Sequence, residues 1–467
     1  MIQVILTDAT IQIDGDENEL KKINKYETFD DSSLCFSKKG YDITKLKHVP
    51  LMKNIKGRLV GFAGLAKEII LFCRNNNIKI ENFEDKRTHF DFQMKEWSDD
   101  ELKKLFDPKF KYVEHQIRSL KAMLKTNKGI CCLPTSAGKS RIMSAWLKLT
   151  NLPTLILTDR STLGAQLAQD FRDQGIDCGF CSGSGVRQGF CMVSTIQSVK
   201  KLDVSRFQMV LVDECHRSSS KSFQDFLASF GCPLKYGFSA SPSNGNLLDF
   251  ARIRQQLGNI IIQVKTNELM DNGVMAKAKI NLVKVDCPET FDYPSANDLG
   301  IVHNKARNEV IKNIVEKHRE EGYICILTRI LEHGEELEKT IPGAVYLKGE
   351  DPLNKRMEII NKFNNGEIPV LIGSSILNEG ISISNMKILI MASGGLAKTQ
   401  TIQKVGRVLR ITKEKREGIF YDFIDVGNKY LFKHSKRRIN LYKEEGFTDM
   451  VILNSDLEEF KQVKKKQ

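Results

Sequence analysis

The chain has 467 residues, of which 41% are hydrophobic and 28% are charged, a balance typical of globular proteins and not of fibrous or disordered ones. It carries 71 Lys and Arg against 58 Asp and Glu, and the formal net charge of +13 favours an anionic partner such as nucleic acid. We expect a cytoplasmic protein, in the host cytoplasm if the source is a phage, because no apolar run approaches the ~18–20 residues of a membrane span and the first residues do not resemble a signal peptide. The eleven cysteines are expected to be reduced thiols.

Residues 1–96 predict a small α+β domain. Apolar residues alternate as in a strand at 4–13, and the segment 65–77 (LAKEIILFCRNNN) predicts a helix with one apolar face. Seven basic residues and one acidic residue gather at 38–58. We expect this cluster to bind the phosphates of a duplex or branched DNA arm, and a solvated charged face is the alternative.

From residue 110 to 430, short apolar runs alternate with helical patterns. Runs of this kind indicate buried parallel strands in an α/β sheet. They predict strands at 130–133, 154–157, 191–193, 209–212 and 236–238, and again at 324–327, 344–347, 370–372, 388–391 and 419–423. We therefore predict two parallel-sheet domains in tandem, at 97–275 and 276–430, followed by a basic helical extension at 431–467.

The first of these strands runs into Leu-Pro-Thr-Ser-Ala-Gly-Lys-Ser at 133–140, ahead of a predicted helix. A strand, a turn and a helix form the context of a phosphate-binding loop, because backbone N–H groups at the helix start point at the phosphates. Lys139 is predicted to reach the β- and γ-phosphates and Ser140 to bind Mg²⁺. A chance match is the alternative, since Leu133 replaces the usual leading glycine. The predicted nucleotide-binding residues of the loop are Pro134, Thr135, Ser136, Ala137, Gly138, Lys139 and Ser140.

The strand at 209–212 ends in Asp213 and Glu214, at the sheet edge where parallel strands present their ligands. We predict that Asp213 binds Mg²⁺ and that Glu214 polarises the attacking water. An acidic turn after a strand is the alternative interpretation. Combined with the loop at 133–140, the pair predicts a site for ATP and Mg²⁺.

These motifs resemble those of the DExH-type superfamily 2 helicases, in which two RecA-like domains surround one ATP. The resemblance covers about residues 110–430. Gln116 resembles the glutamine that reads adenine, and the DECH sequence at 213–216 resembles the family's acidic box. The segments 158–166 and 194–198 resemble the motifs that contact the nucleic-acid strand. The segment 237–242 lies where the family has a hydroxyl-rich linker between hydrolysis and unwinding, and the resemblance makes His216 a coupling residue.

In the second domain, 327–337 resembles motif four and 372–383 resembles motif five, which adds Gly380 to the nucleotide-binding residues. The segment from Gln403 to Arg410 matches the family pattern Q-x-x-G-R-x-x-R. Arg407 and Arg410 are three residues apart, so on a helix they would share one face. The resemblance implies that they stabilise the charge on the transferred phosphoryl group, and a solvated basic helix is the alternative. The predicted catalytic residues are Lys139, Asp213, Glu214, Gln403, Arg407 and Arg410.

The phosphate loop, the DECH box and the stretch at 56–62 further resemble the phage UvsW-type helicases. This resemblance implies an ATP-dependent DNA helicase or translocase that tracks along a single strand, 3′→5′ and as a monomer. It would remodel forks, four-way junctions, D-loops or R-loops in recombination, repair or replication, with RNA as a possible component of R-loops. Two alternatives remain open: an RNA helicase, and a nucleic-acid clamp or annealing factor that uses ATP only as a switch.

Two further patterns have competing interpretations. Residues 398–443 hold 13 Lys and Arg against four acids, which predicts phosphate binding by cations such as Lys433, Lys436, Arg437 and Arg438, or else a solvated face. Cys178 to Cys181 has the spacing of a metal site, but the residues also alternate as in a buried strand, which is the interpretation we favour.

Overall fold

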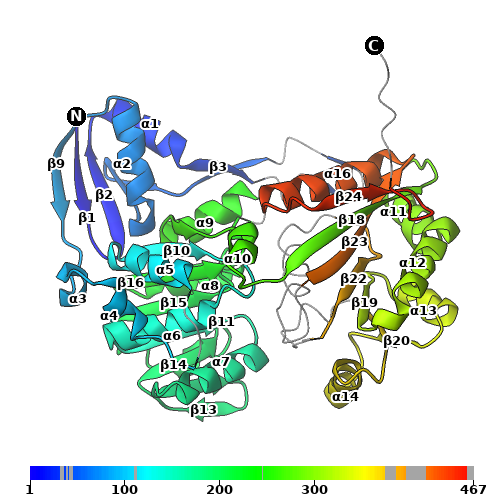
Figure 1. The fold of residues 1–467 in the computed structure, drawn as a ribbon. Helices are drawn as coiled ribbons and strands as arrows, with labels where there is room; N and C mark the ends of the chain where they lie inside the picture. The colour runs from blue at the N-terminus through cyan, green and yellow to red at the C-terminus, as the bar shows by residue number, and fades with distance from the viewer. Residues whose placement is uncertain are drawn as a thin grey trace. The chain divides into compact units, whose positions relative to one another are not determined.

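The computed structural model describes residues 1–31, 36–37, 40–41, 46–109, 113–243, 246–373, 385–395 and 417–459. The chain forms two compact units: residues 1–264 apart from the loop at 134–136, and residues 265–467 together with that loop (Figure 1). No helix in the described ranges is both long and apolar enough to cross a bilayer.

The amino-terminal part of the first unit is a five-stranded sheet in the order β7-β8-β2-β1-β9. One face is buried because the strands alternate, as in β1, where Ile2, Val4 and Leu6 enter the core. The elements are β1 (Ile2–Leu6), β2 (Thr10–Gly15), α1 (Glu17–Tyr26), β3 (Thr28–Asp31), β4 (Phe36–Ser37), β5 (Gly40–Tyr41), β6 (Lys47–Pro50), β7 (Lys53–Ile55), β8 (Arg58–Phe62), α2 (Ala66–Asn75) and β9 (Ile80–Asp85). The prediction of a small α+β region is confirmed.

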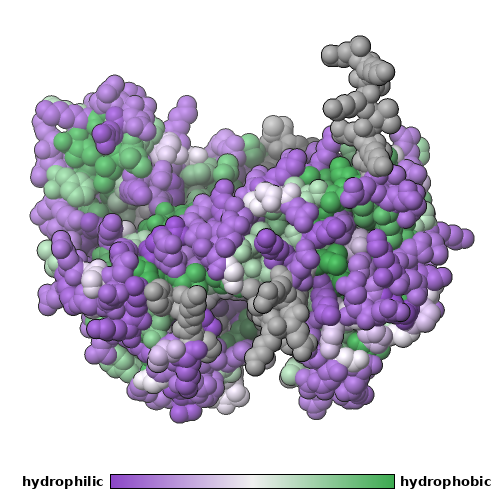
Figure 2. All heavy atoms as spheres, viewed as in Figure 1, coloured by the Kyte–Doolittle hydropathy of each residue, from purple (hydrophilic) through white to green (hydrophobic). Residues whose placement is uncertain are grey.

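Hydrophilic side chains cover most of the face drawn in Figure 2, and apolar surface gathers over the amino-terminal sheet. The exposed large apolar side chains of this region include Leu71 of α2 and Phe83 of β9. Isolated apolar side chains on a surface are normal, because proteins lack enough polar surface to cover themselves.

The rest of the first unit is an eight-stranded sheet in the order β13-β12-β14-β11-β15-β16-β10-β17, parallel except for β13. Its strands are β10 (Lys128–Cys132), β11 (Thr154–Thr158), β12 (Cys178–Ser182), β13 (Gly185–Arg187), β14 (Cys191–Thr195), β15 (Met209–Asp213), β16 (Leu234–Ser239) and β17 (Ile260–Gln263). Its helices are α3 (Asp91–Met94), α4 (Asp99–Lys103), α5 (Glu114–Leu124), α6 (Lys139–Thr150), α7 (Ser161–Asp173), α8 (Lys221–Ser229) and α9 (Leu247–Leu257). All five predicted strands are confirmed, and Cys178 and Cys181 are buried on β12, as the strand interpretation requires.

The second unit contains a seven-stranded parallel sheet in the order β20-β21-β19-β22-β23-β18-β24. Its strands are β18 (Lys277–Asp286), β19 (Ile324–Leu327), β20 (Ala344–Leu347), β21 (Val370–Gly373), β22 (Ile388–Met391), β23 (Glu417–Val426) and β24 (Met450–Leu453). Its helices are α10 (Thr266–Asp271), α11 (Tyr293–Asn297), α12 (Lys305–Lys317), α13 (Leu331–Thr340), α14 (Leu353–Asn364) and α16 (Lys429–Glu444). The five predicted strands are confirmed, while β18 and β24 were not predicted. The boundary predicted after residue 430 falls inside α16, and β24 beyond it pairs with β18. The four predicted domains and the three boundaries between them remain predictions.

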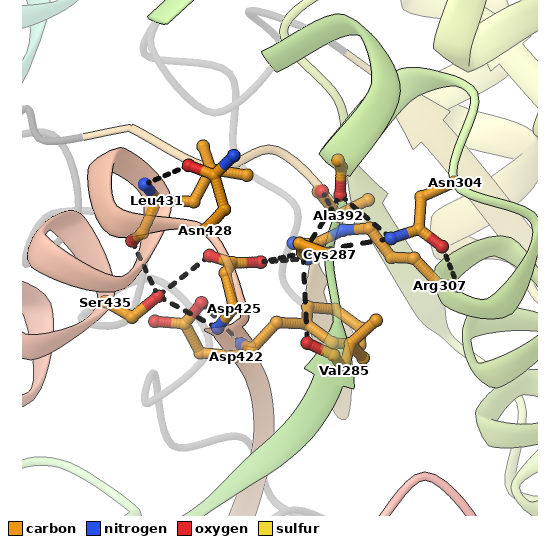
Figure 3. Close-up of polar contacts among 12 residues, drawn as sticks. Val285, Cys287, Asn304, Arg307, Ala392, Asp422, Asp425, Asn428, Leu431 and Ser435 are labelled. Atoms are coloured by element: carbon orange, nitrogen blue, oxygen red, sulfur yellow. Dashed lines mark hydrogen bonds and ion pairs between the residues drawn. The ribbon is translucent and has the colours of Figure 1, made fainter. Parts of the chain in front are cut away.

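Buried ion pairs hold the second unit together (Figure 3). Arg307 of α12 is fully buried, and its Nη1 donates to Asp425 Oδ1 at 2.6 Å while its Nε donates to the Ala392 carbonyl at 3.0 Å. Ser435 of α16 donates to the other Asp425 oxygen at 2.8 Å. One carboxylate at the end of β23 therefore fixes a helix on either side of it.

A second buried pair corrects one expectation from the sequence. Arg438 of α16 is 3% exposed, and its Nε donates to Asp422 Oδ2 at 2.8 Å. The hydroxyl of Tyr442 donates to the same oxygen at 2.8 Å. Arg438 therefore cannot bind phosphates in this fold, because its charge is already paired inside the unit.

Helix α9 attaches the amino-terminal sheet to the eight-stranded sheet. Arg254 of α9 donates through Nη2 to Glu27 Oε2 at 2.6 Å, and the Glu27 side chain is fully buried. Glu68 of α2 accepts from Asn259 Nδ2 at 3.0 Å. A Cβ on Gly64 would lie 2.3 Å from the Arg254 carbonyl oxygen, so the two backbones are in direct contact. The amino-terminal sheet is thus fixed to the first parallel sheet by charge and by close packing.

We expect Arg254→Ala to destabilise the first unit by about 3–5 kcal/mol, because the change leaves Glu27 buried without its cation. Urea unfolding followed by circular dichroism measures the shift. Arg252→Ala is the matched control: this side chain is 32% exposed and pairs only at 3.6 Å, so the change should cost less than ~1 kcal/mol. Equal unfolding midpoints for the two variants would contradict the prediction.

Candidate nucleotide site

The predicted ATP-site residues of the first unit lie at one edge of the eight-stranded sheet. Parallel strands β10, β15 and β16 are neighbours, with β16 between the other two, so their carboxyl ends meet at this edge. The loop at 133–140 follows β10, the DECH box at 213–216 follows β15, and Ser239 ends β16. Segments that are far apart in sequence are thereby placed beside one another, as a ligand site in an open α/β sheet requires.

The loop has the backbone shape of a phosphate cradle. Ser136 and Gly138 both have positive φ angles, of 71° and 79°. Helix α6 begins at Lys139, and the described residues place no side-chain cap on its first N–H groups, which are the groups that bind phosphate at helix starts. The Oγ of Ser136 is buried without a hydrogen-bond partner in the described part of the chain. An anion in the loop would satisfy both kinds of donor, so the residues fit a nucleotide phosphate.

Helix α5 supports the loop through two neighbouring side chains. His115 is fully buried, and its Nε2 donates to the Ala137 carbonyl at 2.7 Å. Gln116 donates to the same carbonyl at 3.4 Å and accepts from the Val113 N–H at 3.1 Å. The φ angle of Gly138 favours glycine, and a Cβ there would lie 2.5 Å from Gln116 Nε2 and would displace the Gln116 amide. The sequence indicated Gln116 but not His115, whose role depends on a contact 22 residues away.

An ion pair joins the loop to the DECH box. Lys139 Nζ donates to Glu214 Oε1 at 2.8 Å, and both side chains are largely buried. Burial by itself would lower the pKa of Lys139, but the carboxylates of Glu214 and Asp213 raise it above its usual value. Burial would likewise raise the pKa of Glu214, but Lys139 and His216 outweigh burial and hold that pKa well below its usual range. Both groups are therefore charged at neutral pH.

Asp213 differs from its neighbour. Burial, and then the charge of Glu214, raise the pKa of Asp213 to about 6. A divalent cation beside it would favour the ionised form, and oxygen atoms such as those of Asp213 and Ser140 are the ligands that Mg²⁺ prefers. Glu214 has a φ angle of 49°, in the left-handed region that residues other than glycine seldom adopt. Strained backbone of this kind is typical of functional positions.

His216 continues the line of contacts away from the loop. Its Nδ1 lies 3.2 Å from Glu214 Oε2 and 3.1 Å from Ser239 Oγ. Ser239 Oγ in turn accepts from the Ser241 N–H at 3.3 Å. The segment after β16 leads into α9, which contacts the amino-terminal sheet. The acidic box and the hydroxyl-rich linker are thus in direct contact.

The remaining predicted motifs fall at sheet edges or outside the described residues. The segments 158–166 and 194–198 follow β11 and β14 at the same edge as the nucleotide site, and 327–337 follows β19 in the second unit. Four predicted site residues lie outside the residues that the structure describes: Gly380, Gln403, Arg407 and Arg410.

Comparisons with known proteins agree with this arrangement. Residues 109–244 match the family model "Type III restriction enzyme, res subunit", and residues 302–412 match "Helicase conserved C-terminal domain". The chain is 26% identical over 371 residues to the ATP-dependent DNA helicase uvsW of Enterobacteria phage T4, covering 69% of this chain and 73% of that protein. It is 24% identical over 387 residues to the DNA 3'-5' translocase XPB2 of Sulfurisphaera tokodaii, covering 72% of this chain and 86% of the relative.

A solved structure supports the fold. The S. cerevisiae protein Dbp5, bound to RNA and ADP BeF3, superposes with a TM-score of 0.54 at 16% identity and covers 76% of this chain and 96% of its own. At this identity the likeness speaks for the fold and leaves the substrate open.

We expect Lys139→Ala to abolish ATP hydrolysis while leaving most nucleic-acid binding intact, because the Lys139 side chain is largely buried and paired with Glu214. The measurements are steady-state phosphate release and binding to a labelled oligonucleotide. Lys148→Ala, on the exposed side of the same helix, is the control and should hydrolyse ATP normally. Loss of nucleic-acid binding together with hydrolysis in Lys139→Ala would count against the separation.

Removing the hydroxyl that contacts His216 should affect coupling more than chemistry. In Ser239→Ala we expect nucleic-acid stimulation of hydrolysis to fall by roughly 3- to 10-fold, the value of about one hydrogen bond, with little change in the unstimulated rate. Ser229→Ala, an exposed serine of α8, serves as control. Equal losses of stimulated and unstimulated rates would assign Ser239 a purely structural role.

Proposed function

We propose that this protein, a superfamily 2 helicase, uses ATP hydrolysis to move along DNA and remodel branched duplexes such as forks, four-way junctions, D-loops and R-loops. The observation that carries the proposal is the continuous line of contacts from Lys139 through Glu214 and His216 to Ser239. This line connects the phosphate loop to the acidic box and to the linker after β16, at the edge of the sheet where segments 158–166 and 194–198 also lie.

The proposed ATP site consists of the residues that the sequence predicts for it. When bound, ATP would supply the phosphoryl group and Mg²⁺ would neutralise its charge. Ser136 and Lys139 would bind phosphate oxygens, Ser140 and Asp213 would hold Mg²⁺, and Gln116 would read the base. The family resemblance further proposes Gly380 as a nucleotide contact and Gln403, Arg407 and Arg410 as catalytic residues. In the described structure, Lys139 and Glu214 are both charged at neutral pH, as these proposed roles require.

The ion pair gives Glu214 a means of activation. A phosphate oxygen within reach of Lys139 competes with the Glu214 carboxylate for the same ammonium group. Glu214, once released, can accept a hydrogen bond from a water molecule and orient it. Because the pKa of Glu214 lies well below its usual range, this carboxylate is ionised before that exchange begins.

DNA is the proposed partner because the curated relatives that the chain matches over about 70% of its length are a DNA helicase and a DNA translocase. The branched class of substrate follows from the similarity to the phage enzyme. We infer a monomer that tracks along one strand in the cytoplasm of an infected cell, and that meets RNA in R-loops. The exposed cations Lys433, Lys436 and Arg437 of α16 offer the surface for phosphates.

The test compares hydrolysis stimulated by single strands, duplex, forks and four-way junctions, at equal nucleotide concentration and fixed salt. We expect forks and junctions to stimulate more than plain duplex, with ATP-dependent strand displacement that Lys139→Ala lacks. Stronger stimulation by RNA would replace this proposal with an RNA helicase. Binding and annealing without strand displacement would replace it with an ATP-switched clamp.

A further inference from the structure

Phe291 stands out on the surface of the second unit. Its side chain is 99% exposed, at the tip of the loop that joins β18 to α11. The backbone of the loop is nevertheless fixed: Asn428 Nδ2 donates to the Pro288 carbonyl at 2.8 Å and to Thr290 Oγ1 at 2.9 Å. The Tyr430 hydroxyl donates to the Phe291 carbonyl at 2.7 Å. A large apolar ring is therefore held in solvent by an ordered support.

The support is a small apolar cluster. Cys287, Ala296, Ile301 and Leu431 are buried together, and Tyr293 and Tyr430 pack against them. The Tyr293 ring lies 5.1 Å from the ring of His434 on α16. The loop, α11 and the first half of α16 therefore form one rigid surface. A rigid aromatic side chain loses little conformational entropy when it binds, so it suits recognition.

Cations line the adjacent face of α16. Its exposed basic side chains are Lys429, Lys433, Lys436, Arg437 and Lys443. From Lys429 to Lys443 the helix rises about 21 Å, which is long enough to follow several phosphates of one strand. Lys436 also lies over the Phe432 ring, with Nζ 4.6 Å from its centroid. Glu444 is the acid at the far end of this face.

The loop itself carries the opposite charge. Asp286, Glu289 and Asp292 are exposed around Phe291, and Asp292 also caps α11 by accepting from the Ser295 N–H. These acids would repel a phosphate at the loop tip but would not repel the uncharged face of a base. The two neighbouring surfaces thus suit different parts of a nucleic acid. The aromatic ring on the loop suits a base, and the basic helix suits the phosphate backbone.

We propose that Phe291 stacks on an unpaired base of a DNA single strand whose phosphates lie along the basic face of α16. Alternation of stacking rings and cations is how proteins hold single strands without reading sequence. The loop follows β18 and the motif at 327–337 follows β19, so in this parallel sheet both lie at the same edge. The proposal deepens the proposed function, on which it rests, by naming a strand-binding site outside the helicase motifs.

A fluorescence experiment tests the contact directly and without ATP. The chain has two tryptophans, so Phe291→Trp adds a third on the exposed loop. We expect its emission to be quenched by an oligo-dT strand, saturably and less at high salt, and not by blunt duplex of the same length. Quenching equal to that of the unsubstituted protein would overturn the proposal. Quenching by duplex as strong as by the single strand would also overturn it.

An affinity series gives the magnitude. Phe291→Ala should weaken single-strand binding by about 5- to 150-fold, the range of one base stacked on an aromatic ring, and Phe291→Tyr should restore it. Lys433→Ala combined with Lys436→Ala should reduce the slope of log affinity against log salt by roughly 1.4. Phe83→Ala, an exposed phenylalanine of the amino-terminal sheet, is the control and should bind normally.

The two proposals fail separately. Normal single-strand affinity in Phe291→Ala overturns the stacking site, whatever the enzyme hydrolyses, and would point instead to a protein partner for the exposed ring. Loss of affinity in Phe291→Ala without any stimulation of hydrolysis by forks in the unsubstituted protein would keep the strand site and overturn the proposed function. Both measurements use the full-length chain.

Discussion

The ion pair between Lys139 and Glu214 is the interaction on which the functional architecture depends. It joins the loop after β10 to the acidic box after β15, and it forms because a parallel sheet brings the ends of these strands to one edge with β16 between them. Burial and neighbouring charges together set the two pKa values: Lys139 keeps Glu214 ionised, while burial and then the charge of Glu214 raise the pKa of Asp213 to about 6. Two adjacent carboxylates thereby have different pKa values, as the roles proposed for Asp213 with a metal ion and for Glu214 with water require.

Buried charge pairs recur wherever this chain must fix one element against another. Arg307 with Asp425 and Arg438 with Asp422 hold helices to β23, and Arg254 with Glu27 fixes the amino-terminal sheet. Such pairs add little net stability compared with apolar packing, but breaking one leaves a costly unpaired charge. They therefore select one geometry of packing. In a protein that converts chemical change into displacement, a fixed geometry within each unit is what allows small shifts to be transmitted.

Much of this structure could be predicted from the sequence, because its signals are local. Apolar runs of three to five residues predicted ten strands of the two parallel sheets, and the loop and acidic box predicted the edge where the candidate site lies. The strand β18 was not predicted, because its polar residues Lys277, Lys279 and Asn281 interrupt the apolar run. His115, the Glu27 pair and the burial of Arg438 depend on contacts between distant segments, which no local pattern reports. Arg438 looked like a free cation for the same reason.

The buried ion pair between Glu27 and Arg254 has a mechanical consequence. A domain joined by a flexible linker could change its orientation freely. The amino-terminal sheet is instead fixed against the eight-stranded sheet by a salt bridge and by backbone contact at Gly64. A duplex arm bound to the amino-terminal sheet would therefore move together with the eight-stranded sheet as one rigid body. A displacement that begins at the nucleotide would then reach the bound arm with little loss, because the connection between them is rigid.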